Sequence, residues 1–275
     1  MKLACNYLSE AEELLNEGKV EFDYFKYPSL GGDNSFRSIS SFLERLRYIR
    51  NIRPLLYHGI FPNKVNICNR NFKDNFNIES FREVCRISDT PGISFHLNGA
   101  DMDESKEEVI SNAVENILFI KENFMDMEFI TFENAMGNYN QHELDAEVIS
   151  EIVCQSESKF LYDVSHAYWS AVKREETFER YVSKLPLDRV YEVHINGWEE
   201  KDGDIQSHMK IQDRLYEHIE NIVSTFPVKI VTLEYGRSYD RIGCGCPLVS
   251  IDKINSHAKE EVKEQIHRLS EIINK

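Results

Sequence analysis

Eight short runs rich in β-branched and aromatic residues recur along the chain, and segments with helical spacing of apolar residues separate them. The predicted strands cover residues 2–6, 20–27, 53–59, 92–98, 128–133, 159–164, 190–196 and 228–234. Several are almost continuous apolar runs, which is typical of parallel strands buried on both faces. Eight alternating strand–helix units in 275 residues predict an α/β protein, a closed (β/α)8 barrel of the TIM type that forms a single domain over residues 1–275.

The segments between the predicted strands carry the apolar stripes of helices that cover a barrel. In residues 103–124 the stripe consists of Val109, Ala113, Asn116, Ile117 and Ile120. In the last helix, 251–273, it consists of Ile254, Val262, Ile266, Leu269 and Ile273. Residues 61–80 are irregular and predict a loop with a short helix on the upper face of the barrel. An open doubly wound sheet is the alternative, but no Gly-x-Gly-x-x-Gly follows the first strand and no Walker-type loop occurs.

The formal net charge of −15 argues against two classes of partner. Binding along a nucleic-acid backbone calls for a basic footprint, and so does docking on an anionic membrane. No apolar stretch approaches the roughly 18 residues that span a bilayer, and acidic residues interrupt the beginning of the chain, where a signal peptide would be apolar. The sequence therefore predicts a cytoplasmic protein with neither a nucleic acid nor a membrane as partner.

The six cysteines are mostly scattered, which predicts reduced thiols rather than a disulfide framework. Cys244 and Cys246 form the one local pair. No second pair has the spacing of a zinc site, so the pair is interpreted as a detail of a loop.

Residue types that bind metals gather at the carboxyl ends of the predicted strands, where barrel enzymes place their chemistry. Six consecutive strands, the third to the eighth, each end in such residues: His58, His96, Glu133, Asp163 with His166, His194, and Glu234. His208 follows the seventh strand in a polar segment that we expect to be a loop over the site. The remaining histidines are expected to be surface groups: His142, His218, His257 and His267.

This set of side chains predicts more than one metal ion. Neutral imidazoles and ionised carboxylates are good ligands for zinc, iron or manganese. Three carboxylates with up to five imidazoles exceed the three or four protein ligands of a tetrahedral zinc. They would also form a costly cluster of charge unless cations neutralised it. Two or three ions bridged by carboxylates resolve both difficulties, and Glu133, on the middle strand of the series, is the expected bridge.

A barrel that binds sugars and transfers protons, with one ion or none, is the alternative interpretation of the same residues. Glu133 and Glu234 could then act as an acid–base pair near a substrate carbonyl. A catalytic lysine at a strand end would favour this interpretation, and only Lys26, near the second strand, is placed for that role.

Six phrases carry the strand-end residues: Pro54-Leu-Leu-Tyr-His58-Gly, Ser94-Phe-His96-Leu, Phe132-Glu133-Asn134, Asp163-Val-Ser-His166, Val190-Tyr-Glu-Val-His194-Ile-Asn-Gly197 and Leu233-Glu234. In order and spacing, over about residues 2–236, they resemble the multinuclear non-heme iron-dependent oxidative enzymes. That family includes the iron subunit of the methanobactin-forming enzyme and an enzyme that excises a cysteine β-carbon from a carrier peptide. The Glu-Asn after the fifth strand and the Asp-x-x-His after the sixth are among the most specific pieces.

The resemblance implies a xylose-isomerase-like barrel that holds two or three iron ions. Carried over residue by residue, it makes eight residues the expected ligands: His58, His96, Glu133, Asp163, His166, His194, His208 and Glu234. Glu133, Asp163 and His166 are also expected to take part in catalysis. Three departures favour two irons over three: His166 stands where Asn is frequent, Gln206 stands where an Asp ligand is usual, and Tyr235-Gly236 follows the final Glu.

The same resemblance implies an oxidase or oxygenase that uses dioxygen to modify a residue, usually cysteine, of a ribosomally made precursor peptide. A cysteine thiolate is a soft ligand that suits an open iron position. The expected partners are therefore the precursor peptide and a second protein that presents it.

Three other functions share parts of this pattern. A metal-dependent sugar isomerase or epimerase has the same barrel and strand-end ligands. A three-zinc phosphodiesterase acting on damaged DNA has a similar layout but should present a basic face, which a net charge of −15 does not favour. A non-catalytic barrel that binds a peptide leader or a partner would keep its function when Glu133 is replaced.

Overall fold

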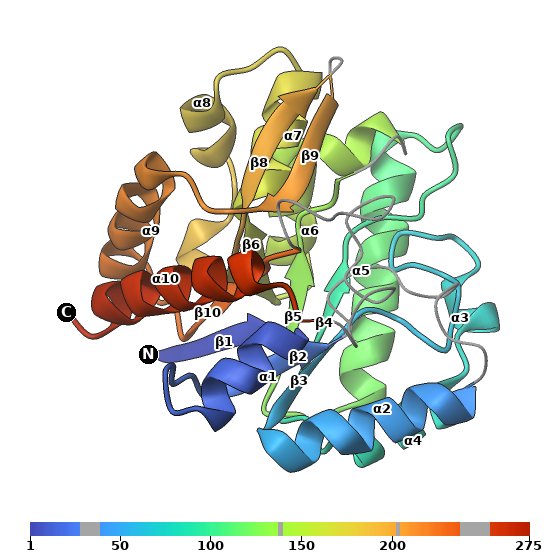
Figure 1. Ribbon diagram of the computed structural model, residues 1–275. Coiled ribbons are helices and arrows are strands. Elements are labelled where there is room, and N and C mark those ends of the chain that lie inside the picture. Colours follow the sequence, from blue (N-terminus) through green and yellow to red (C-terminus); the bar gives the residue numbers. More distant parts are fainter. Residues whose placement is uncertain (28–38, 137–139, 202–203, 237–253) are drawn as a thin grey trace.

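The computed structural model describes residues 1–27, 39–136, 140–201, 204–236 and 254–275. Eight parallel strands close into a barrel in the order β1-β10-β7-β6-β5-β4-β3-β2 (Figure 1). In chain order they are β1 Lys2–Asn6, β2 Tyr24–Tyr27, β3 Leu55–His58, β4 Gly92–His96, β5 Phe129–Glu133, β6 Lys159–Asp163, β7 Val190–Ile195 and β10 Ile230–Leu233. The predicted (β/α)8 barrel is therefore confirmed.

Helices alternate with these strands and surround the barrel (Figure 1). The α-helices are α1 Ser9–Asn16, α2 Ile39–Ile52, α3 Phe72–Asn75, α4 Ile78–Ser88, α5 Lys106–Asn123, α6 Ala146–Gln155, α7 Val164–Lys173, α8 Phe178–Val182, α9 Asp213–Thr225 and α10 Ser256–Ile273. Two short 3-10 helices, η1 Gln141–Leu144 and η2 Leu187–Arg189, precede α6 and β7. Within the described residues, no helix is both long and apolar enough to cross a membrane.

All eight predicted strand ranges contain the observed strands, and the largest difference is at β2. The predicted range 20–27 is too long at its beginning, since the strand starts only at Tyr24. The preceding Asp23 uses its carboxylate to accept a hydrogen bond from the Leu3 amide at 2.9 Å. The Leu3 amide of β1 is therefore bonded to the Asp23 side chain and not to the backbone of β2. Regular pairing of β1 with β2 begins at Tyr24.

The predicted helices begin where side chains cap them. Ser105 and Glu108 form a capping box at the start of α5, and the predicted stripe of this helix is buried. Asn255 accepts hydrogen bonds from two amides at the start of α10. Ile254 precedes that cap and is 48% exposed, so its predicted place in the apolar stripe is wrong. The predicted helix residues 251–253 lie outside the described residues.

The irregular segment 61–80 contains the short helix α3 and the first turn of α4. It packs beside the carboxyl end of β4, where the Cys68 amide donates to the Asn98 carbonyl at 2.9 Å. The side chain of Asn116, on α5, donates to the carbonyls of Ile67 and Asn69. The prediction of a loop with a short helix on the upper face is confirmed.

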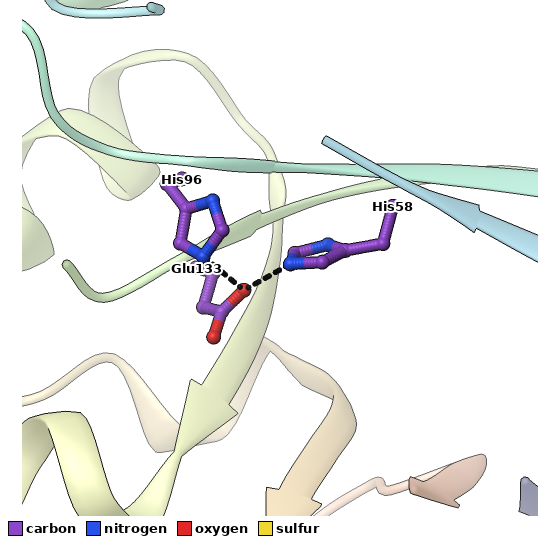
Figure 2. Close-up of side chains that lie close together, drawn as sticks. All are labelled: His58, His96 and Glu133. Carbon is purple, nitrogen blue, oxygen red and sulfur yellow. Dashed lines mark ion pairs between the residues drawn. The ribbon is translucent and has the colours of Figure 1, made fainter. Parts of the chain in front are cut away.

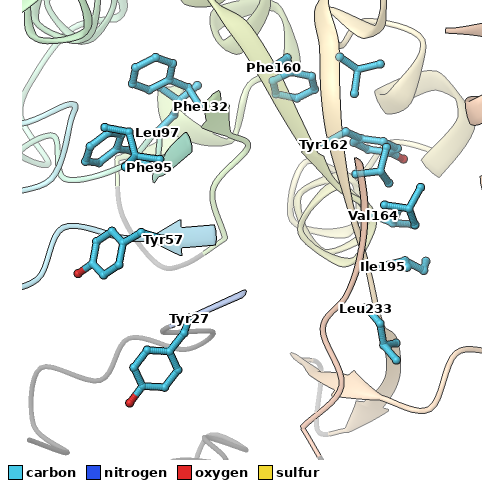
Figure 3. Close-up of a cluster of buried hydrophobic side chains, with 14 of the residues drawn as sticks. Tyr27, Tyr57, Phe95, Leu97, Phe132, Phe160, Tyr162, Val164, Ile195 and Leu233 are labelled. Atoms are coloured by element: carbon cyan, nitrogen blue, oxygen red, sulfur yellow. The ribbon is translucent and has the colours of Figure 1, made fainter. Parts of the chain in front are cut away.

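Alternate residues of each barrel strand face opposite sides. One set, which includes Tyr57, Phe95, Phe132 and Tyr162, packs in the apolar layer between strands and helices (Figure 3). The other set faces the barrel interior. Its lowest layer is a small apolar cluster made of Ala4, Leu56, Phe129 and Ile230. Polar side chains follow above this floor, toward the carboxyl ends of the strands.

A two-stranded antiparallel hairpin, β8 Gly197–Lys201 and β9 Asp204–Met209, stands above β7 beside α7 (Figure 1). The loop predicted around His208 is thus wrong, because these residues form regular strands. Gly197 allows the hairpin to close, since a Cβ atom built there would lie 1.8 Å from the Lys210 carbonyl oxygen. The hairpin brings His208 back over the barrel mouth, with a φ of 62° at that residue.

We predict that Gly197→Ala lowers the free energy of unfolding by about 2 kcal/mol, because the new methyl group must push apart two backbone segments. Chemical denaturation of the metal-free protein measures this change. Glu199→Ala, at an exposed position of the same strand, is the matched control and should change stability by no more than about 0.5 kcal/mol. Equal stabilities of the two variants would contradict the close approach at Gly197.

Candidate metal centre

The barrel mouth gathers all eight side chains that the sequence singled out. His58, His96, Glu133 and Asp163 are the last residues of their strands, and Glu234 directly follows β10. His194 lies inside β7, while the first turn of α7 supplies His166 and β9 supplies His208. Seven of the eight are buried, and the His96 side chain is 33% exposed.

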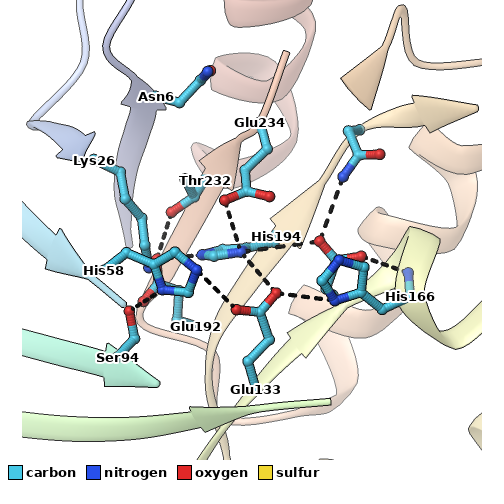
Figure 4. Close-up of polar contacts among 12 residues, drawn as sticks. Asn6, Lys26, His58, Ser94, Glu133, His166, Glu192, His194, Thr232 and Glu234 are labelled. Carbon is cyan, nitrogen blue, oxygen red and sulfur yellow. Dashed lines mark hydrogen bonds and ion pairs between the residues drawn. The ribbon is translucent and has the colours of Figure 1, made fainter. Parts of the chain in front are cut away.

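The Glu133 carboxylate lies at the centre of this group. Its Oε2 is 3.2 Å from His58 Nε2 and 3.4 Å from His96 Nε2 (Figure 2). Its Oε1 is 3.3 Å from Nδ1 of both His166 and His194 (Figure 4). One carboxylate therefore faces four imidazoles, two on each oxygen, which is the arrangement expected of a bridging group.

The other two carboxylates extend the group on either side of His194. Glu234 Oε1 lies 3.1 Å from His194 Nδ1, and its Oε2 lies 3.9 Å from His208 Nδ1. Asp163 Oδ2 lies 4.0 Å from His194 Nδ1. The other oxygen of Asp163 accepts the His166 amide at 2.7 Å, so this side chain also caps α7.

Three overlapping sets of donor atoms lie within 4.8 Å of one another in the described residues. They are His58 with His96 and Glu133, His58 with His194 and Glu234, and Glu133 with Asp163 and His166. His58 and Glu133 each belong to two sets. His208 belongs to none of these sets, and its ring lies 3.9 Å from the Glu234 carboxylate.

Hydrogen bonds to the rings select which nitrogen of each histidine can bind a cation. His58 Nδ1 contacts the Ser94 hydroxyl at 2.8 Å, and that hydroxyl donates onward to the Tyr57 carbonyl. The Nδ1 atoms of His166 and His208 donate to backbone carbonyls at 2.8 and 3.2 Å. Each of these rings then keeps Nε2 as its lone-pair nitrogen, so His166 meets Glu133 Oε1 through its protonated Nδ1 and has Nε2 left to bind a cation.

Burial and neighbouring charges set the protonation of the centre. Burial lowers the pKa of His58 well below its ordinary value, so the ring is neutral. Burial opposes ionisation of Glu133, but the charges of His96 and His194 bring its pKa below the ordinary value. Burial likewise opposes the charged form of His194, yet Glu234 holds the pKa of that ring well above normal. A bound cation could replace this proton in neutralising the carboxylates.

The chemistry of the donor atoms fits metal ions. In the described part of the chain, both Glu133 oxygens, Glu234 Oε1 and His194 Nδ1 are buried without a partner in hydrogen-bond geometry. A buried polar atom left unpaired costs roughly 1–3 kcal/mol, and more when it is charged. Cations placed among these lone pairs would satisfy all four atoms together. The residues present are therefore suited to hold the ions that the sequence predicts.

Asparagines after three strands position the donor residues, a role that the sequence reasoning missed. The Asn134 side chain makes two hydrogen bonds to the Asp163 backbone, at 2.8 and 2.9 Å. Asn6 bridges the Tyr235 backbone in the same way, directly beside Glu234. The sequence did offer the Glu133-Asn134 pair as a specific part of the family resemblance, but it did not indicate that the asparagine holds the Asp163 backbone.

A third asparagine, Asn196, links the hairpin to the mouth. It accepts the His208 amide at 2.9 Å and donates to Asp163 Oδ2 at 3.4 Å. Gln206, which stands where the resemblance expects an Asp ligand, is exposed on β9. The hairpin therefore brings one imidazole, from His208, to the site, and the carboxamide of Gln206 stays at the surface.

The histidines expected at the surface follow the prediction with one exception. His257 and His267 are exposed and His142 is partly exposed. His218 is half-buried, and its Nε2 lies 3.0 Å from the Tyr162 hydroxyl, so its description as a surface group is wrong. Cys244 and Cys246 lie outside the described residues.

The fold and site define a (β/α)8 barrel with candidate metal-binding residues at its mouth, and comparison with known proteins identifies its family. Residues 9–243 match the family of the RiPP precursor modification enzymes MbnB/TglH/ChrH, where RiPP denotes a ribosomally made, post-translationally modified peptide. The chain belongs to this family. A curated relative, the UPF0276 protein of Psychromonas ingrahamii, is 23% identical over 190 residues, which cover 63% of this chain and 66% of the relative. The match thus spans just under two thirds of that relative.

Solved structures share the fold at low sequence identity. The IOLI protein with a bound zinc atom is 14% identical, with a TM-score of 0.65 and coverage of 99% of this chain and 98% of its own. D-psicose 3-epimerase with D-fructose is 13% identical, with a TM-score of 0.59 and coverage of 98% and 97%. These likenesses confirm a barrel of the xylose-isomerase type.

We predict that Asn134→Ala lowers the free energy of unfolding by about 2 kcal/mol, because it leaves the Asp163 amide and carbonyl without their side-chain partner. Denaturant titration gives the stability, and metal content after purification shows whether Asp163 is still held in place. Asn75→Ala, which removes an exposed helical asparagine, is the control. A variant as stable as wild type would show that Asn134 does not hold Asp163.

A second prediction concerns Glu143, whose Oε1 accepts the Ala100 amide in the loop after β4, at 2.7 Å. Burial raises the pKa of this carboxyl from 4.5 to about 7. Between these values the native state holds a proton that the unfolded state has released, so stability falls as pH rises through this window. Glu143→Gln keeps the acceptor and should remove this fall, raising stability at pH 8 by about 3 kcal/mol relative to wild type.

Unfolding free energies at about pH 4.5 and pH 8 test the Glu143 prediction, since the advantage of the Gln variant should be small at the lower pH. Glu122→Gln, an exposed change of the same charge, shows how much of any effect comes from net charge alone. An advantage of Glu143→Gln that is equal at both pH values would contradict the raised pKa.

Proposed function

We propose that this chain is an iron-dependent oxidase or oxygenase that holds two iron ions, or three, and uses dioxygen to modify a cysteine of a ribosomally made precursor peptide. The observation that carries the proposal is the convergence of five imidazoles and three carboxylates, with the Glu133 carboxylate at the centre, in a chain of a peptide-modifying family. So many donors exceed the needs of a single ion.

In this proposal Glu133 bridges two ions, one on each carboxylate oxygen. His58 and His96 lie beside one oxygen, and His166 and His194 lie beside the other. The remaining donors, Asp163, Glu234 and His208, complete the set. The His208 ring lies farther from its carboxylate, at 3.9 Å from Glu234, than the other four imidazoles lie from Glu133, which favours two ions over three.

The donor side chains are accessible to a substrate from one side of the site, where His96 is partly exposed. Most donors are buried and held by second hydrogen bonds, which fixes their direction and keeps water away from them. His96 is the exposed member, so we propose that the peptide approaches over β4. Iron bound here would supply an open position for a soft thiolate and one-electron chemistry with dioxygen.

A sugar isomerase or epimerase is less well supported. Lys26, the one lysine that the sequence offered for catalysis, is fully buried in an ion pair with Glu192 at 2.6 Å. Its ammonium group is therefore engaged below the donor atoms. The likeness to D-psicose 3-epimerase concerns the fold, which hosts many unrelated chemistries.

The proposed partners are the precursor peptide and a second protein that presents it, and the proposed location is the cytoplasm. The peptide is proposed because the family modifies RiPP precursors. The presenting protein and the location rest on the resemblance and on the composition of the chain.

Metal analysis of protein purified without oxygen tests this proposal. We expect about two irons per chain, a new ferric–thiolate absorption on adding a cysteine-containing peptide, and oxygen uptake with that peptide. Glu133→Ala should lose most of the iron, because it removes the group shared by both positions. Glu128→Ala, at an exposed position before the same strand, is the matched control and should keep its iron.

Stoichiometric zinc or manganese, with no oxygen uptake on any thiol peptide, would contradict the iron oxidase. Full iron content in Glu133→Ala would contradict the bridge alone. Conversion of a ketose by the zinc- or manganese-loaded protein would favour the isomerase instead.

A further inference from the structure

A buried ion pair crosses the barrel interior directly beneath the donor atoms. Lys26 Nζ, from β2, lies 2.6 Å from Glu192 Oε1, from β7, and their side chains are 0% and 1% exposed. Figure 4 shows the lysine reaching down past His58 to the glutamate. The pair lies between the apolar floor of the barrel and the proposed metal centre.

A need for stability does not account for such a pair. Withdrawing two charges from water is costly, and replacing a buried ion pair by apolar side chains of similar size is often neutral or stabilising. Barrel interiors of this kind are commonly filled by Val, Ile and Leu. The two charged side chains in this layer therefore indicate a role other than packing the barrel interior.

The contacts of Glu192 show what that task is. The same oxygen that accepts from Lys26 also accepts the Thr232 hydroxyl at 2.6 Å. It further accepts from His194 Nε2 at 3.2 Å. Because an ionised carboxylate can only accept, His194 must carry its proton on Nε2. Its Nδ1 faces the Glu133 and Glu234 carboxylates, so this is the nitrogen whose lone pair becomes available once a cation replaces the proton between them.

This choice of nitrogen is opposite to that of the other rings. His58, His166 and His208 are held through Nδ1 and offer Nε2. His194 alone among these four is held through Nε2 by a carboxylate. Without a hydrogen-bond partner at Nε2, a neutral imidazole would populate both tautomers. Its ring could also flip, which would turn Nδ1 away from the other donor atoms.

We propose that Glu192 is a positioning residue that fixes His194 as an Nδ1 ligand, and that Lys26 and Thr232 hold Glu192 in place for this task. The inference rests on the proposed metal centre, but it does not depend on iron or on oxidation. It assigns a role to the one lysine that the sequence placed near the site.

Two double variants separate positioning from mere filling of space. Lys26→Met with Glu192→Gln removes both charges but keeps an oxygen that can accept from His194 Nε2. Lys26→Met with Glu192→Leu removes the charges and the acceptor together. Single substitutions are avoided because each would leave one buried charge unpaired.

The first readout is metal affinity, measured by titrating metal-free protein with zinc against a competing chelator. We expect the Leu pair to bind zinc roughly 10–100-fold more weakly than wild type, as is typical when the partner of a ligating histidine is lost. The Gln pair should stay close to wild type. Unfolding curves of the metal-free proteins check that both pairs fold.

The second readout is the nitrogen NMR spectrum of the zinc-loaded proteins with labelled histidine. In wild type and in the Gln pair, His194 should show a zinc-bound Nδ1 and a protonated Nε2. In the Leu pair this signature should be lost or divided between the two nitrogens. A merely structural ion pair would leave the spectrum unchanged in every folded variant.

Equal zinc affinity and an unchanged His194 signature in the Leu pair would overturn the inference. An equal loss of affinity in both pairs would also overturn it, because the acceptor would then make no difference. Zinc serves as the probe, so failure of the iron oxidase leaves this test valid. Wild-type protein that binds neither zinc nor iron would overturn both proposals.

Discussion

The two-residue repeat of the β-strand decides which side chains of this protein meet. In a closed parallel barrel, alternate residues of every strand enter one shared interior, and the others pack against the helices. His58, Glu133 and Asp163 end neighbouring parts of the same wall, so they deliver their donor atoms at one height. A slip of one residue in β5 would turn Glu133 outward and Phe132 inward, which would disrupt both the site and the apolar layer. The same strand register therefore places Glu133 in the candidate metal centre and Phe132 in the apolar layer.

The barrel interior changes from apolar at its floor to charged and polar at its mouth. Ala4, Leu56, Phe129 and Ile230 close the floor, and the Lys26–Glu192 pair forms a charged layer above them. The donor set lies on top, where its buried carboxylates face imidazoles without hydrogen-bond geometry. Each layer restricts the next, since the charged layer holds His194 and the floor excludes water from below. The helices contribute by covering the outside, and α7 alone adds a donor, His166, from its first turn.

The same barrel occurs in proteins named for zinc binding and for sugar epimerisation, so architecture by itself does not decide the chemistry. Membership of the family of RiPP precursor modification enzymes supports the proposal of a peptide substrate. What this chain adds is its own arrangement: a central carboxylate between two pairs of imidazoles, one exposed imidazole at the mouth, and a hairpin that closes one side. These features support the proposal that a peptide reaches the site from the side of His96.

The sequence by itself determined the barrel and the eight His, Asp and Glu residues that meet at its mouth, because strand periodicity and the position of strand ends are local properties. It did not determine the hairpin that carries His208, since β8 and β9 pair only with each other and their short polar runs resemble a loop. It also could not assign Asn6, Asn134 and Asn196, whose partners lie on other strands. Lys26 shows the limit most clearly. Its position near a strand end suggested catalysis, but only the closed barrel brings it to Glu192, 166 residues away. Local pattern specifies which residues reach the interior, and three-dimensional closure decides which of them touch.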